Sequence, residues 1–164
     1  MEYLDTWRRL QAEGAPFAAG SDEEARAIAR FREVLSDFKA PGLGERAAEV
    51  YAPGAWFNDT LKTVRGGEAI GRYLGKTAEA LESGTVEFLD FVGANGDYYV
   101  RWEMRLRFAK LDRGTTHTSV GMSHLRFDRE GRVVLHQDFW DPVTGLFEHV
   151  PGLGWLMRQV KGRI

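Results

Sequence analysis

The chain has 164 residues, the length of one globular domain with one hydrophobic core. Hydrophobic residues make up 43% and charged residues 28%, a balance typical of a soluble folded protein and not of a disordered or fibrous one. The formal net charge of -2 gives no general attraction to phosphate backbones or anionic membranes, so we expect no nucleic acid partner.

The sequence contains no cysteine, which excludes disulfides, thiolate metal sites and a cysteine nucleophile, and favours a reducing compartment. Charged residues interrupt the first twenty positions, and no apolar run approaches the roughly 18 residues of a membrane span. We therefore expect a cytoplasmic protein without integral membrane association. Aromatic residues reach 12%, which indicates either a bulky core or a cavity lined for an apolar ligand.

The first elements in chain order are predicted to be helices. Residues 1–20 form an N-terminal extension that we expect to be a short helix, because apolar residues recur there at helical spacing: Tyr3, Leu4, Trp7 and Leu10. A clearer helix begins at Ser21, since Ser21 and Glu24 have the spacing of a capping box. Its apolar stripe comprises Ile28, Phe31, Leu35 and Phe38. A second short helix is expected over 45–51.

Strands are expected from residue 55 onward, with one helix among them. Pro53-Gly54 is predicted to break the chain before a short strand over 55–59, and a third helix follows Gly67. After Gly84 the apolar period changes from about 3.6 to 2, which predicts four strands over 86–92, 98–108, 116–127 and 132–140. Asn95-Gly96 is suited to a type I′ hairpin turn between the first two.

This order of elements predicts an α+β fold, in which a curved antiparallel sheet wraps around the N-terminal helices. Residues 21–141 are expected to form this domain. The tail over 142–164 has an amphipathic, basic pattern. We expect it to cover the open end of the domain as a lid or to contact a second subunit, while a membrane surface is the alternative.

Two segments carry a resemblance to a known family. The first joins Trp56-Phe57-Asn58-Asp59 through Val64-Arg65-Gly66 to the helix expected over 68–74, and the second runs from Ser123-His124-Leu125-Arg126-Phe127 to His136-Gln137-Asp138-Phe139-Trp140. With the order of elements over residues 25–141, they resemble the nuclear transport factor two-like superfamily, in its SnoaL-like and ketosteroid-isomerase-like branch. The resemblance implies a cone-shaped, cystatin-like scaffold that hosts isomerases, cyclases, hydrolases and non-catalytic binders.

Asp59 lies where the resemblance places the carboxylate base of ketosteroid-isomerase-like members. Aromatic neighbours such as Trp56 would desolvate this carboxylate and raise its pKa, so that it could take a proton next to a carbonyl. The family has proline after this aspartate, and Thr60 stands there in this chain. Asn58 and Asp59 face opposite ways along a strand, so only one is expected to face the cavity without a bulge. The alternative role of Asp59 is to cap a hairpin turn.

Asp138 is our first choice for a catalytic residue, because it falls close to the acid/base aspartate of SnoaL-like cyclases. His136 and Trp140 share its face of the last strand, and His136 could hydrogen-bond it or exchange a proton with it. The alternative is that this face is partly exposed at a sheet edge.

His124 is a further catalytic candidate, or else a core histidine with one partner. Its strand is expected to pair with the last strand and to place His124 across from His136 or Asp138. These three residue types also match a two-histidine, one-carboxylate metal triad. The resemblance implies no metal, so we expect neither a metal nor a cofactor.

The remaining candidates are ligand-binding residues around the expected cavity: Tyr51, Trp56, Asn58, Tyr73, Trp102, Met104, Met122 and Trp140. The two tyrosines could donate to a ligand carbonyl, and Trp102 belongs to the expected cavity floor. The predicted function is that of a homodimeric, SnoaL-like protein that binds a small apolar carbonyl or epoxide compound and, if it is an enzyme, acts as a cofactor-free isomerase, cyclase or hydrolase. The alternative is a non-catalytic ligand-binding or protein-interaction module.

Overall fold

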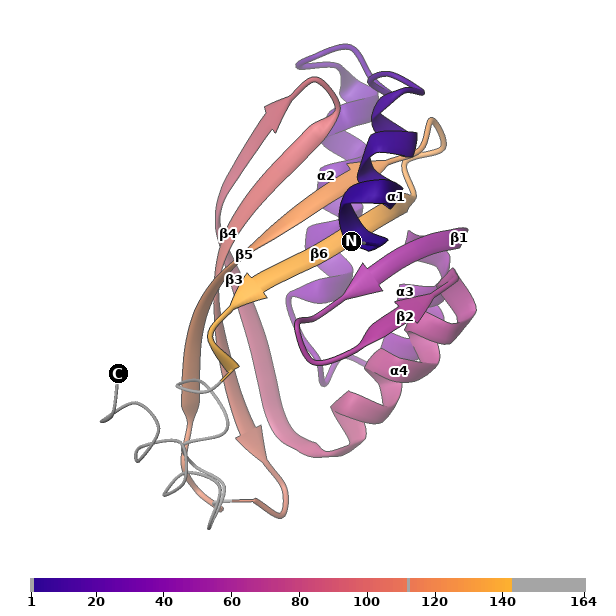
Figure 1. Ribbon diagram of the computed structural model, residues 1–164. Coiled ribbons are helices and arrows are strands. Elements are labelled where there is room, and N and C mark those ends of the chain that lie inside the picture. Colours follow the sequence, from indigo (N-terminus) through magenta and orange to yellow (C-terminus); the bar gives the residue numbers. More distant parts are fainter. Residues whose placement is uncertain (1, 112, 143–164) are drawn as a thin grey trace, which may run out of the picture.

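The computed structural model describes residues 2–111 and 113–142, which form a curved, six-stranded sheet with helices on both faces (Figure 1). The helices in this part of the chain are α1 (Glu2–Gln11), α2 (Asp22–Leu35), α3 (Leu43–Val50) and α4 (Gly67–Glu79). The strands are β1 (Tyr51–Asn58), β2 (Thr63–Arg65), β3 (Leu81–Ala94), β4 (Asp97–Phe108), β5 (His117–Phe127) and β6 (Val133–Trp140). The predicted α+β class with a curved sheet is confirmed. The expected tail helix lies outside the described residues.

The sheet has the order β2-β1-β6-β5-β4-β3. Its longest hairpin joins β3 to β4 through Asn95 and Gly96, whose φ angles of 54° and 81° are those that the predicted type I′ turn requires. All neighbouring strands are antiparallel except β1 and β6, which run parallel. The sheet is therefore mixed and not wholly antiparallel, because β1 returns to β6 from a distant part of the chain.

The sequence predicts that Pro53-Gly54 breaks the chain before the strand. This prediction is wrong, because both residues lie within β1. Both residues are exposed, and the register of β1 against β6 shifts between Tyr51 and Trp56. Proline lacks a backbone N–H and is tolerated in a sheet at such a bulge. As a result β1 begins at Tyr51, four residues before its predicted start, directly after α3.

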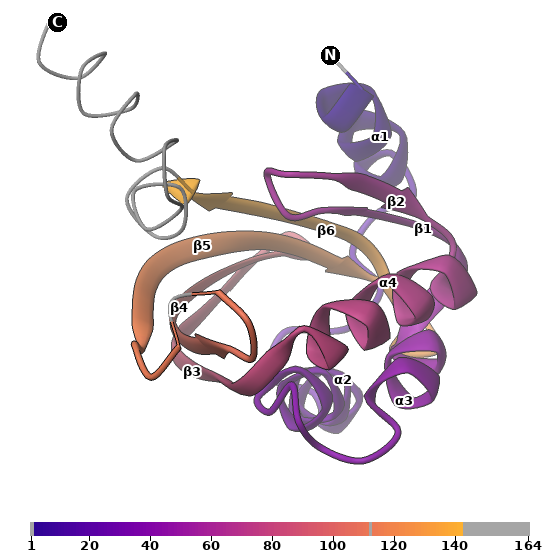
Figure 2. The ribbon, with the colours of Figure 1, turned by 90° about the horizontal axis from the view of Figure 1, so that it is seen from below.

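Helices α2, α3 and α4 lie on the concave face of the sheet, and α1 lies on the opposite, outer face (Figure 2). The core fills the concave side, with Phe31 of α2 at its centre in ring contact with Phe88, Phe91 and Phe127. None of the described helices is both long and apolar enough to cross a membrane.

The predicted capping box at the start of α2 forms in part. The Ser21 hydroxyl accepts from the Glu24 backbone N–H, as expected. The Glu24 carboxylate instead accepts from the Gly20 N–H and from the Tyr98 hydroxyl. The acidic residue thus both caps the helix and ties it to β4.

A buried polar cluster, which we call the α1 anchor, fixes α1 to the outer face. At its centre Asp97 Oδ1 accepts from the Trp7 indole at 3.0 Å, from His124 Nε2 at 2.8 Å and from the Arg126 guanidinium at 2.7 Å. The Tyr3 hydroxyl meets the other nitrogen of His124 at 2.7 Å. Arg126, only 2% exposed, also donates to two carbonyls at the end of α1, those of Leu10 and Gly14.

We expect Asp97→Asn to lower the free energy of unfolding by about 3 kcal/mol, because it leaves the buried Arg126 guanidinium without its counter-ion. Chemical denaturation monitored by circular dichroism measures this change. Asp90→Asn is the matched control: Asp90 pairs with Arg101 on the exposed sheet surface, so its loss should change stability by about 1 kcal/mol or less. Equal effects of the two substitutions would contradict the anchor.

Burial lowers the pKa of His124 below its ordinary 6.5, and the nearby Asp97 offsets only part of this effect. As the pH falls through 6.5, the unfolded chain therefore binds a proton before the folded chain does, and the fold loses stability. We expect the unfolding free energy of the wild type to fall more steeply than that of His124→Gln between pH 7 and pH 5. A stability difference that stays constant over this range would refute the prediction.

Candidate functional site

A cavity of about 180 Å³ lies between the concave face of the sheet and helices α2 and α4. Most of its wall is apolar: Phe31, Leu35, Phe38, Phe57, Leu61, Leu74, Val86, Phe88, Trp102, Met104, Leu106, Phe108 and Trp140. The polar side chains in the wall are Asp59, Tyr73, Thr77, Ser123, His136 and Asp138. A dry cavity of about 150 Å³ accommodates benzene, so this one suits a molecule of about the size of a substituted benzene.

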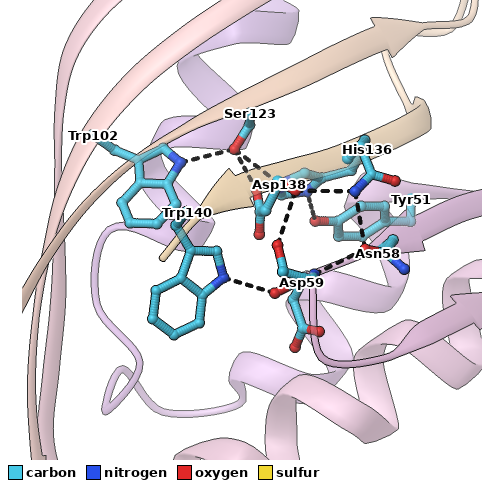
Figure 3. Close-up of polar contacts among 10 residues, drawn as sticks. Tyr51, Asn58, Asp59, Trp102, Ser123, His136, Asp138 and Trp140 are labelled. Carbon is cyan, nitrogen blue, oxygen red and sulfur yellow. Dashed lines mark hydrogen bonds and ion pairs between the residues drawn. The ribbon is translucent and has the colours of Figure 1, made fainter. Parts of the chain in front are cut away.

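Asp138 is held in the wall through one of its two carboxylate oxygens. Strand alternation turns His136, Asp138 and Trp140 of β6 toward the cavity, as predicted. Oδ1 of Asp138 meets His136 Nε2 at 2.8 Å and accepts from the Ser123 hydroxyl at 2.5 Å (Figure 3). Among the described residues no hydrogen bond reaches Oδ2, which leaves this oxygen for a ligand.

The Tyr51 hydroxyl contacts the ring nitrogen of His136 that Asp138 does not contact. This buried hydroxyl lies 2.7 Å from His136 Nδ1 (Figure 3). Burial, and secondly the charge of Asp138, raise the pKa of Tyr51 well above its usual range, so the phenol keeps its proton. A buried hydroxyl needs an acceptor, and Nδ1 is the one it meets. His136 thus links Tyr51, through Nδ1, to Asp138, through Nε2.

Ser123 is supported by the cavity floor. The Trp102 indole donates to the Ser123 hydroxyl at 2.9 Å, and this hydroxyl then donates to Asp138. The Trp102 ring lies over Gly121, where a Cβ atom would collide with the indole and approach the Cβ of Trp140 to 2.9 Å. The absence of a side chain at Gly121 thus permits the position of Trp102.

Asp59 caps a turn, as one of the two expected alternatives has it, and also lines the cavity. Its Oδ1 accepts from the backbone N–H groups of Leu61 and Lys62, and its Oδ2 accepts from the Tyr73 hydroxyl at 2.5 Å. Burial, then the hydrogen bond to Asp59, raise the pKa of Tyr73 well above its usual range, so Tyr73 remains a donor. Thr60 has φ 76°, which the proline of the family pattern could not adopt.

Two hydrogen bonds tie the turn after β1 to the end of β6 and hold the two aspartates on one side of the cavity. The Trp140 indole donates to the Asp59 carbonyl at 2.7 Å, and the Thr60 hydroxyl donates to the Asp138 carbonyl at 3.0 Å. Figure 3 shows Trp102 and Trp140 beside both aspartates. This end of the cavity is its polar end.

Five of the predicted site residues lie outside the cavity. Asn58 pairs with Gln137 on the outer face, which leaves Asp59 as the residue that faces inward. Trp56 packs with Leu10 of α1 on the outer face. Met122 is 46% exposed on the same face. Tyr51, although buried beneath His136, does not line the cavity either.

The fifth is His124, which does not lie across from His136 or Asp138. It pairs with Gln137, one position away, and directly opposite residues of a strand pair share a face. His124 therefore points outward into the α1 anchor, and the metal triad considered above is not formed. Within residues 2–111 and 113–142, no three histidine or acidic side chains are placed to share a metal ion.

Ser123 and Thr77 line the cavity but were not predicted from the sequence. The position of Ser123 follows from strand parity once the partner of β5 is known, because Ser123 lies directly opposite Asp138. Serine on a strand carries no chemical signal by itself.

Comparison with known proteins identifies the family. A SnoaL-like domain model matches residues 28–136. The fold is shared with an LEH-like epoxide hydrolase of M. tuberculosis, which is 15% identical with a TM-score of 0.62 and covers 84% of this chain and 96% of its own. A ketosteroid isomerase-like protein of Catenulispora acidiphila, solved with trimethylamine, is 14% identical with a TM-score of 0.67, over 79% and 95% of the two chains.

A third structure, of a SnoaL-like candidate polyketide cyclase from Jannaschia sp., is 14% identical with a TM-score of 0.61, over 76% of this chain and 90% of its own. No curated protein sequence matches significantly. At these identities the structures show a common nuclear transport factor two-like fold and not a common activity. The family model spans more than half of the chain, and the chain belongs to the SnoaL-like domain family.

Proposed function

We propose that the protein binds a small, largely apolar molecule in the cavity and moves protons on it without a cofactor. The observation that carries this proposal is the way in which Asp138 is held in the cavity wall. This carboxylate is anchored through Oδ1 by Ser123 and His136, while Oδ2 remains available at the wall of an apolar cavity. A carboxylate held in this way can take a proton from a bound molecule and return it.

The reactions that fit are isomerisation, aldol-type cyclisation and addition of water to a carbonyl or epoxide compound. Asp138 would take a proton from carbon next to a carbonyl, or from a water molecule that attacks the epoxide. The same proton is returned to the product, so no oxidant or reductant is consumed. His136 and Ser123 act as positioning residues, because they fix Oδ1 and not the substrate.

Asp59 is proposed as the second acid/base group, with Tyr73 as its partner. Both oxygens of Asp59 already accept hydrogen bonds, whereas Oδ2 of Asp138 is available, so Asp138 is proposed as the main acid/base group. His124 takes no part in this proposal, because the sheet separates it from the cavity.

The alternative function is ligand binding without catalysis. It is supported by the ketosteroid isomerase-like neighbour, which was solved with a small molecule, trimethylamine. The presence of four titratable side chains in the cavity wall, Asp59, Tyr73, His136 and Asp138, favours the enzyme. A pure binder would need only apolar walls and one or two hydrogen bonds.

Activity assays with a panel of small carbonyl and epoxide compounds test the proposed enzymatic function. For any compound that is turned over, we expect Asp138→Asn to lower kcat/KM by about 100-fold or more, since the variant keeps the shape but cannot take a proton. Asp59→Asn should have a smaller effect. Asp90→Asn, on the outer face, is the control and should keep wild-type activity. Full activity of both cavity variants would exclude the mechanism.

We also propose that two copies pair through the outer face of the sheet. Large apolar side chains are exposed there on four neighbouring strands: Val92, Tyr99, Val120, Met122 and Phe139. Ion pairs such as Arg101–Asp90 and Arg105–Glu103 border them. An apolar patch with a charged rim of both signs is complementary to a copy of itself.

Analytical ultracentrifugation tests this pairing. We expect a dimer for the wild type and a monomer for Val120→Lys, because the lysine would place a charge within the apolar patch. Val120→Thr, which nearly keeps the side-chain volume, is the control and should remain dimeric. A wild type that is monomeric at 100 µM, a concentration of the order at which weak dimers form, would overturn the proposal.

A further inference from the structure

The cavity has an unbalanced charge. Within residues 2–111 and 113–142, its wall holds two carboxylates, Asp59 and Asp138, and neither lysine nor arginine. A nearby cation in this part of the chain is Lys62, but its ammonium lies over the Tyr73 ring, 5.3 Å from the centroid, on an exposed turn. One imidazole, that of His136, faces these two carboxylates and contacts Asp138 alone of the two.

In the described part of the chain, neither carboxylate is contacted by a lysine or an arginine. Asp138 is held by a serine hydroxyl and an imidazole N–H, and Asp59 by two backbone N–H groups and a phenol. Such donors stabilise a negative charge but do not cancel it. The other buried carboxylate, Asp97, contacts the Arg126 guanidinium at 2.7 Å. The same fold thus neutralises an acid where its role is structural, but leaves two acids without a counter-ion in the cavity.

Aromatic rings surround the two carboxylates. Trp102, Trp140, Phe57 and Tyr73 all belong to the wall. The indole N–H groups of both tryptophans are already donated to the protein, to Ser123 Oγ and to the Asp59 carbonyl. These hydrogen bonds fix the rings, so a ligand in the cavity meets the rings and not free indole N–H groups. The face of an aromatic ring attracts a cation.

We infer that the molecule taken by this cavity carries a positively charged nitrogen, a protonated or quaternary amine, on an apolar body. This inference rests on the proposed ligand-binding role of the cavity and names the class of ligand. The amine lies at the polar end, between the aspartates and the tryptophans. The apolar body lies against the other wall residues, among them Phe88, Met104 and Phe108. Carboxylate ligands are rejected by like charge.

Three probes of matched size test the charge preference at pH 7: benzylamine as the cation, benzyl alcohol as the neutral molecule and benzoate as the anion. By isothermal titration calorimetry we expect benzylamine to bind at least about tenfold more tightly than benzyl alcohol, and benzoate not to bind. Asp138→Asn and Asp59→Asn should each weaken benzylamine binding about fivefold or more, while benzyl alcohol binding changes less than about twofold. Asp90→Asn should change neither.

The outcomes separate this inference from the proposed function. If benzyl alcohol binds as tightly as benzylamine, or if both cavity variants keep the preference for the cation, the cavity binds ligands but the inference is wrong. If none of the three probes binds to the folded wild type, the proposed ligand-binding role fails together with the inference. Thermal denaturation of each variant confirms that the protein titrated is folded.

Discussion

Side chains on β5 and β6 point alternately to the two faces of the sheet, and a buried polar cluster lies on each face. Ser123, His136 and Asp138 face the cavity, whereas His124 and Arg126 face α1. A slip of one residue in the pairing of these strands would turn each set to the opposite face. Both the cavity chemistry and the attachment of α1 therefore depend on one register.

The two clusters differ in the partners of their carboxylates: an arginine contacts Asp97, whereas a serine and a histidine contact Asp138. In the α1 anchor a guanidinium faces the carboxylate, and the same guanidinium satisfies two backbone carbonyls at the end of α1. Breaking such a pair leaves an unpaired buried charge, which is why it fixes the arrangement so firmly. In the cavity, the hydrogen bonds from Ser123 and His136 orient Asp138. The second oxygen of this carboxylate is then available to a bound molecule. The cluster that attaches α1 and the cluster that lines the cavity thus lie on opposite faces of one sheet.

The sequence predicts most of the local structure, because local patterns determine it. The alternation over 98–108 and the Asn95-Gly96 turn identify the β3–β4 hairpin, and Ser21 marks the start of α2. The parallel pairing of β1 with β6 has no local signal, since it joins residues about 80 positions apart. The bulge at Pro53-Gly54 follows from this pairing and could not be predicted without it.

The distinction between local patterns and long-range pairing also holds for the residues of the site. Asp138, His136, Asp59 and Tyr73 were all predicted, since a carboxylate, an imidazole or a phenol next to an apolar pattern carries a chemical signal. The face on which His124 lies depends on the β5–β6 register, which parity alone does not fix. The α1 anchor was not foreseen, because Tyr3 and His124 are 121 positions apart and meet only in the folded chain.

Four of the five tryptophans lie in the described part of the chain and are divided between the two faces. Trp102 and Trp140 line the cavity, whereas Trp7 belongs to α1 and Trp56 packs against it. Indole fluorescence depends on the polarity and quenchers around each ring. Variants that keep a single tryptophan would therefore provide optical reporters for ligand entry on one face and for the docking of α1 on the other, without any added label.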